Sequence, residues 1–210
     1  LGLDAIAAYL QDVASDDALD AAVDNALAWL VRRTLIRVDS PPVANERLTL
    51  TTFCTGSGRS WAERRTTLAG SAGGHVEAVS LWVQIDVTTG RPARLADDFF
   101  ATWGEAAGER TVSSKLSLPQ APPPEGAVSQ PWSFRRADLD QFAHVNNAAV
   151  WTAVEEILQR DAVARASLTA EIEYLAPAAA GVEMQLVRAG EHMWLTLDGR
   201  SVIAARVLGL

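Results

Sequence analysis

Ten residues in the second half of the chain, 138–147, bring together two carboxylates and an imidazole, which could do acid–base chemistry, and two asparagine amides. They read Asp-Leu-Asp-Gln-Phe-Ala-His-Val-Asn-Asn and precede an apolar stretch of helical periodicity. Asp140 could act as general base on water or as nucleophile, while His144 positions or polarises the reacting group. Asn146 or Asn147 is a natural N-cap, and a helix start offers unpaired backbone N–H groups to a developing oxyanion. The segment therefore predicts acyl-transfer chemistry at a helix start.

The same residues also have a purely structural interpretation. Asp138 and Asp140 can form an Asx turn, the asparagine pair can cap the helix, and His144 can pack against its neighbours. Glu155 and Glu156 follow two turns into the helix as further carboxylates, although glutamates at such positions are more often solvated helix charges. Bare physics leaves the chemical and the structural interpretations about equal.

Composition and charge exclude several classes of protein. The 210 residues are 49% hydrophobic and 21% charged, a balance that supports a buried core. Since no run approaches the roughly 20 apolar residues that cross a bilayer, we expect no membrane partner. The net charge of −8 argues against nucleic acid, because phosphate neutralisation needs a basic face. A single cysteine and an N-terminus without a basic flank favour a cytoplasmic location.

Arginines nevertheless gather at places where an anionic partner could dock. Salt bridges or solvation explain most such clusters, and a phosphate-facing role for one of them is the alternative. The clusters are Arg32, Arg33 and Arg37, then Arg64 and Arg65, then Arg135 and Arg136.

Hydrophobic periodicity predicts two helices and two trains of strands. The helices cover residues 3–14 and 147–160. Asp97 and Asp98 are expected on a solvated turn, and the proline-rich stretch 104–127 reads as a linker. The strands are expected at about 27–38, 46–55, 59–69, 75–86, 130–136, 168–175, 182–188, 192–197 and 201–208.

The two halves of the chain also match each other directly. Residues 36–50 align without a gap to residues 172–186, so that Ile36 corresponds to Ile172 at a constant shift of about 136. Each half reads as a helix followed by strands, without the intervening helices that a parallel doubly wound sheet needs. The strand before the second helix has no counterpart before the first, so we expect the first strand of repeat one to be missing.

These observations predict an α+β fold of two fused repeats. The N-terminal repeat covers 1–103, the linker 104–127, and the C-terminal repeat with the polar turn 128–210. Since a fused pair imitates a dimer of single repeats, the monomer could suffice, and a homodimer stays compatible with the sequence.

The segment 138–147 resembles the D-x-D-x-x-x-H-V-N-N signature of the fatty acyl-ACP thioesterases and of broader hot-dog thioesterases. The likeness extends through LQDVA, WLVRRTLI, ERLTLTTFCTGSGRSWAERR, SLWVQID, RPARLADDF and the EY…P run after the second helix. The resemblance implies a double hot-dog fold, in which an antiparallel sheet wraps long helices. It also implies hydrolysis of fatty acyl thioesters of acyl carrier protein or coenzyme A. Water is the second substrate, so no cofactor is expected.

Carried over residue by residue, the resemblance makes Asp140 and His144 catalytic. Phe142 stands where the plant enzymes have a catalytic asparagine, and it is predicted to line the substrate site together with Asn146 and Asn147. Where those enzymes have Glu-Cys, this chain has Pro177 and Ala178. The resemblance therefore leaves Asp140 as the principal base.

Other residues of chemical interest have plainer interpretations. The first repeat has no His-Asn-Asn at its helix start, so it is expected to supply the acyl pocket instead. Core packing is the competing explanation for its large aromatics. Cys54 reads as a buried thiol, and His75 and His192 lack metal-ligand spacing, so no metal site is predicted. The aromatics in question are Trp29, Phe53, Trp61 and Trp82.

Two alternatives to a thioesterase stay open. A non-catalytic acyl-binding or regulatory protein is favoured by Phe142 and Pro177, and opposed by the retained Asp140 and His144. A hot-dog hydratase or dehydratase is less compatible, because that branch has Asn-Pro before its histidine and this chain has Phe142-Ala143.

Overall fold

The computed structural model describes residues 1–20, 27–120, 125, 127–140, 143–160 and 167–209. Within these ranges the helices are α1 (Leu3–Asp20), α2 (Asp97–Ala107) and α3 (Asn147–Arg160), with one 3₁₀ turn, η1 (Arg136–Asp138). The strands are β1 (Leu27–Ser40), β2 (Leu48–Ser57), β3 (Trp61–Gly70), β4 (His75–Asp86), β5 (Val128–Trp132), β6 (Leu168–Tyr174), β7 (Met184–Ala189), β8 (His192–Leu197) and β9 (Arg200–Leu208).

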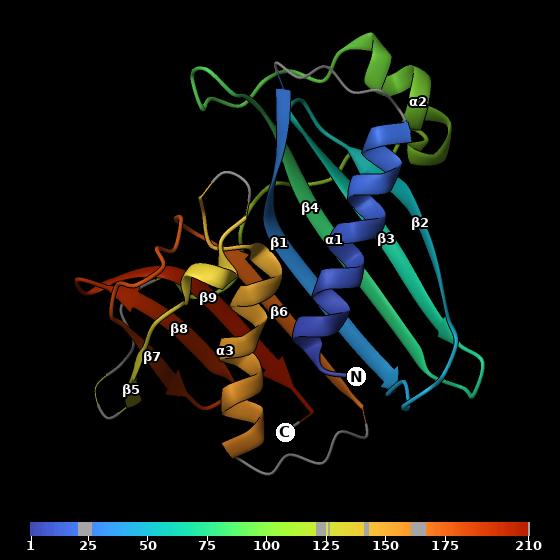
Figure 1. The fold of residues 1–210 in the computed structure, drawn as a ribbon. Helices are drawn as coiled ribbons and strands as arrows, with labels where there is room; N and C mark the ends of the chain where they lie inside the picture. Colours follow the sequence, from blue (N-terminus) through green and yellow to red (C-terminus); the bar gives the residue numbers. More distant parts are fainter. Residues whose placement is uncertain (21–26, 121–124, 126, 141–142, 161–166, 210) are drawn as a thin grey trace.

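The nine described strands form one continuous antiparallel sheet. Their order is β2-β3-β4-β1-β6-β9-β8-β7-β5, so each repeat contributes one half and β1 pairs with β6 where the halves meet. Figure 1 shows α1 and α3 beside each other on one face of the sheet, running in opposite directions. This is the arrangement expected for two fused helix-on-sheet repeats.

The register of β1 against β6 places an approximate two-fold axis between the repeats. Leu35 lies directly opposite Glu171, and these positions differ by the shift of 136 found in the sequence. An antiparallel pair crossed by a two-fold axis must pair one residue with its own equivalent. The first residues of β2 and β7, Leu48 and Met184, obey the same shift. The internal repeat is therefore present in the structure as well as in the sequence.

The main core lies between the two helices and the sheet. Ile36 and Ile172, equivalent residues of the central strands, are both 0% exposed. The apolar faces of α1 and α3 close over them, as burial of an amphipathic stripe requires. The buried helix residues are Leu3, Ile6, Ala7 and Leu10 of α1, and Val150, Trp151, Ala153, Val154, Ile157 and Leu158 of α3.

Two expectations about the elements are corrected by the structure. Helix α1 continues to Asp20 rather than ending near residue 14; Asp17 on its added turns accepts hydrogen bonds from Arg64 and from Trp103 Nε1. Asp97 and Asp98 do not lie on a turn after a strand. They form the first turn of α2, where carboxylates favour the positive end of the helix dipole.

The edges of the sheet differ between the repeats. β5 pairs with β7 at one edge, whereas β2 forms the other edge and no described strand precedes α1. The division into 1–103, 104–127 and 128–210 stays a prediction; α2 runs across its first boundary.

Candidate active site

The described residues of the polar segment, 138–140 and 143–147, form a turn that leads into α3. Leu139 and Val145 form an isolated antiparallel bridge. Inside it, the Asp140 N–H donates to the His144 carbonyl at 2.8 Å. Ala143 completes the reversal with φ of 61°, an uncommon left-handed conformation for a residue with a side chain. Backbone bonds within the segment therefore fix its shape.

The turn brings the two predicted catalytic residues together. Asp140 Oδ1 accepts a hydrogen bond from the His144 backbone N–H at 3.0 Å. Asp140 is half-buried and the residue His144 is exposed. The carboxylate thus stabilises the turn through the His144 backbone, as the structural interpretation proposed, and the His144 residue itself is open to solvent.

Asp138 has a different role from Asp140. Its two oxygens accept hydrogen bonds from the Arg135 backbone N–H and from Arg135 Nη2, both at 2.7 Å. The side-chain bond from Arg135 lowers the pKa of Asp138 below its usual range. Asp138 is therefore an ionised cap of the short turn η1.

The two asparagines at the start of α3 have different roles. Asn146 is the N-cap, since its Oδ1 accepts a hydrogen bond from the Ala148 N–H at 2.8 Å. Asn147 begins the helix, and its carbonyl accepts a hydrogen bond from the Tyr174 hydroxyl at 3.1 Å. Burial raises the pKa of Tyr174 far above its usual value, so this hydroxyl stays protonated and keeps donating. Phe142, predicted to line the site, lies outside the described residues.

A cavity separates α1 and the start of α3 from the sheet. At about 20 Å³ it has room for about one water molecule, so an acyl chain enters only if lining side chains move. Asn147 and Ala148 form the end that adjoins the polar turn. The other lining residues are Ala7, Leu10, Gln11, Val31, Thr34, Ser80, Trp82, Trp151 and Tyr174.

Comparison with known proteins decides the family. A model of the acyl-ACP thioesterase N-terminal domain matches residues 1–103, and a model of its C-terminal domain matches residues 123–201. The chain belongs to the acyl-ACP thioesterase family. The predicted class of enzyme, a thioester hydrolase, is thereby confirmed.

Relatives and solved structures agree with this assignment. An uncharacterised protein of Mycobacterium tuberculosis is 32% identical over 193 residues, which cover 91% of this chain and 76% of that protein. The 12:0-ACP thioesterase from Umbellularia californica is 20% identical with a TM-score of 0.78, covering 98% of this chain and 88% of its own. An acyl-ACP thioesterase from Bacteroides thetaiotaomicron is 19% identical with a TM-score of 0.79, covering 99% and 89%. These structures confirm the predicted α+β double hot-dog fold.

The aromatics of the acyl-ACP thioesterase's first repeat are not gathered in one pocket. Trp82 lines the cavity under α1, but Trp29 packs against Phe99 of α2 with ring centroids 5.9 Å apart. The Trp61 Nε1–H donates to a carbonyl of the segment after α2, and Phe53 is 41% exposed. Core and surface packing therefore explain three of these four side chains.

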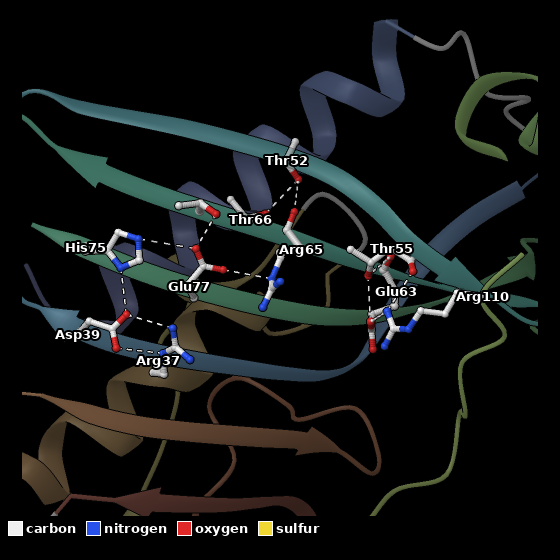
Figure 2. Close-up of polar contacts among 11 residues, drawn as sticks. Arg37, Asp39, Thr52, Thr55, Glu63, Arg65, Thr66, His75, Glu77 and Arg110 are labelled. Carbon is white, nitrogen blue, oxygen red and sulfur yellow. Dashed lines mark hydrogen bonds and ion pairs between the residues drawn. The ribbon is translucent and has the colours of Figure 1, made fainter. Parts of the chain in front are cut away.

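Most of the predicted arginine clusters are engaged within the protein. Figure 2 shows Arg37 paired with Asp39 along β1, and Arg65 of β3 paired with Glu77 of the neighbouring β4, on the sheet face away from the helices. The remaining contacts pair Arg33 with Glu63 and Glu171, Arg64 with Asp17, Arg135 with Asp138, and Arg32 with the Tyr174 carbonyl. Arg136 is exposed and has no ion pair among the described residues. Only this arginine keeps the docking interpretation open among those predicted.

One residue of structural importance was missed by sequence reasoning. Glu173 is 0% exposed and lies on the sheet face away from the helices. Its carboxylate accepts hydrogen bonds from the Ser117 N–H at 2.5 Å and the Leu118 N–H at 3.2 Å. The glutamate was visible in the EY…P run, but only the structure reveals that it binds the segment joining the repeats.

No helix among the described residues is long and apolar enough to cross a membrane. Within the same residues, no three histidine, cysteine, aspartate or glutamate side chains gather as metal ligands would.

Proposed function

We propose that this acyl-ACP thioesterase hydrolyses fatty acyl thioesters at the turn 138–147, with Asp140 and His144 as its catalytic residues. One observation carries the proposal: the turn that holds both residues leads directly into α3, whose first residues line the cavity between the repeats. The acyl chain occupies that cavity and the thioester lies across the start of α3. Asn146 and Asn147 fix this helix start, and Phe142 is proposed to contact the substrate.

The reaction needs only water as the second substrate. Asp140 accepts a proton from water while the water oxygen attacks the acyl carbon. The carbonyl oxygen becomes negatively charged, and N–H groups in the first turn of α3 stabilise it, apart from that of Ala148, which Asn146 already binds. The carbon–sulfur bond then breaks, the thiolate takes up a proton, and a free fatty acid leaves. His144 polarises the reacting groups and passes the proton.

Acyl carrier protein is the proposed carrier, and fatty acid synthesis in the cytoplasm the proposed setting. The family supports the carrier, and one exposed arginine, Arg136, stands two residues before Asp138 without an ion pair among the described residues. Carrier proteins are generally acidic, so a protein with a net charge of −8 needs a local cation to orient one. Coenzyme A thioesters are the alternative substrates; a metal, another cofactor or a homodimer forms no part of the proposal.

A non-catalytic acyl-binding role is the second candidate. Pro177 is exposed and Ala178 is buried. Because these residues are proline and alanine, they supply neither the carboxylate nor the thiol that the plant enzymes have at these positions. Such a protein would bind the acyl chain in the same cavity without releasing thiol.

Thiol release from acyl carrier protein and coenzyme A thioesters of graded chain length tests these candidates. The proposal predicts multiple turnovers, with faster release from the carrier protein than from coenzyme A. Acyl binding without turnover on either carrier would support the binding protein instead.

A further inference from the structure

The helix start in the first repeat is already occupied by a side chain of the second. Glu155 of α3 places Oε1 at 2.5 Å from the Leu3 N–H, the first residue of α1. A Cβ added to Gly2 would come within 3.2 Å of the same oxygen, so the carboxylate sits closely against the chain entering the helix. An anion at this place stabilises the positive end of the α1 dipole.

Glu155 and Gln11 hold matching positions in the two helices when residues are counted from each helix start. Glu155 is the ninth residue of α3, and Gln11 is the ninth residue of α1. The helices α1 and α3 run in opposite directions side by side (Figure 1). The bond from the Leu3 N–H to Glu155 accordingly places the ninth residue of α3 against the first turn of α1. Gln11 indeed lines the cavity together with Asn147 and Ala148, the first residues of α3.

The two related positions therefore differ in charge. At the start of α1, a carboxylate takes the place that a developing oxyanion would need. At the start of α3, the neutral Gln11 lines the same cavity as Asn147 and Ala148, and the Gln11 side chain makes no hydrogen bond to another described residue. The NH₂ group of glutamine is a hydrogen-bond donor without charge, so it can bind an oxyanion without competing with it.

We propose that Gln11 is a further residue of the thioesterase site, contributed by the first repeat. Its side-chain amide donates a hydrogen bond to the thioester carbonyl oxygen at the start of α3, while Glu155 closes the equivalent position at α1. The inference rests on the proposed function, because it assigns the carbonyl to the start of α3. It explains why one of two related helix starts is open to substrate.

Two variants of Gln11 test the assignment by turnover. Gln11→Ala is expected to lower kcat by about 100-fold, the loss typical of one oxyanion donor, with little change in thermal midpoint because alanine suits a helix. Gln11→Glu is expected to lower kcat further, since its carboxylate would occupy the start of α3 as Glu155 occupies that of α1. Glu155→Gln is the control, with a lower thermal midpoint and unchanged kcat.

Binding of two unreactive analogues separates this inference from the catalytic proposal. One is an acyl-pantetheine whose sulfur is replaced by NH, which keeps the carbonyl; the other is an alkyl thioether, which lacks it. Gln11→Ala should bind the amide about tenfold more weakly and the thioether with unchanged affinity. Equal kcat and equal affinity for the amide in Gln11→Ala and wild type would overturn the assignment, whether or not Asp140 proves to be the base. An inactive wild type would refute the proposed function, yet the two affinities would still decide the role of Gln11.

Discussion

The Asp140 carboxylate stabilises the turn, and in the proposed reaction it is also the base. One oxygen accepts the His144 N–H and holds the turn, while the negative charge is what a base needs. Substitution by alanine would remove both contributions at once. Asparagine keeps an oxygen acceptor and removes only the charge, so it is the substitution that separates structure from chemistry at this position.

Cys54, in contrast, has a side chain of low reactivity. Its side chain is buried under α2, and burial raises the pKa of the thiol above its ordinary value. A raised pKa keeps the thiol protonated and unreactive at neutral and mildly alkaline pH. We therefore predict that an aromatic disulfide reagent at pH 8 labels the native protein far more slowly than the urea-unfolded protein. Equal rates would show that the α2 region opens readily.

At the scale of elements, the segment between the repeats is anchored rather than loose. The indoles of Trp61 and Trp194 donate to the carbonyls of Val112 and Pro119, each within 2.9 Å. Between these two points, Glu173 accepts two backbone N–H groups. The segment thus runs along the sheet face opposite the helices and connects the two halves.

Glu173→Gln tests this anchor. The amide presents one acceptor instead of two and points a donor at backbone N–H groups, so the free energy of unfolding should fall by about 2 kcal/mol. Urea unfolding measures the difference. Glu183→Gln, at an exposed position, is the matched control and should change little. Equal stability of the two variants would contradict the anchoring role.

The elements differ in how far the sequence predicts them. β4 and α3 match their predicted bounds, 75–86 and 147–160, because regular apolar periodicity marks both. The last turns of α1 show no such periodicity; bonds from distant side chains to Asp17 hold them. Helix α2 is short, and its apolar Phe99 and Trp103 are spaced too sparsely to distinguish it from a loop.

The residues of the candidate site also differ in how far the sequence predicts them. The candidate residues of the segment 138–147 are close together in the sequence, so the sequence alone indicates them and the helix that follows. Gln11 is separated from that turn by more than half the chain, and the LQDVA segment that contains it indicates only a helix and a family likeness. Its place at the site depends on the antiparallel packing of α1 against α3, which only the structure reveals.

At the scale of the whole molecule, one sheet and one core join the repeats. Because β1 and β6 pair at the centre, neither half can open without exposing the other. We predict that Ile36→Ala and Ile172→Ala each lower the free energy of unfolding by about 2–5 kcal/mol, since both side chains are fully buried. Urea titration followed by tryptophan fluorescence and by circular dichroism should give one coincident transition for each variant. Two separate transitions would contradict a shared core.

In the proposed site, the two repeats have different roles, and only the helix start of the second repeat binds the thioester. The first repeat keeps the scaffold and supplies Gln11 and much of the cavity wall, while the second supplies the polar turn. Glu155 neutralises the unused start, so its function is structural. The proposed catalytic site therefore lies between the repeats rather than within either one.

The rate of thiol release by Asp140→Asn, compared with Asp138→Asn and wild type, shows whether Asp140 is the base of the proposed reaction. The two carboxylates lie in the same turn, but only Asp140 is assigned as base. We predict that Asp140→Asn lowers kcat by about 10²–10⁴-fold with a thermal midpoint near that of wild type, and that Asp138→Asn keeps most of its activity. Near-wild-type turnover by a folded Asp140→Asn would contradict the assignment of the catalytic base.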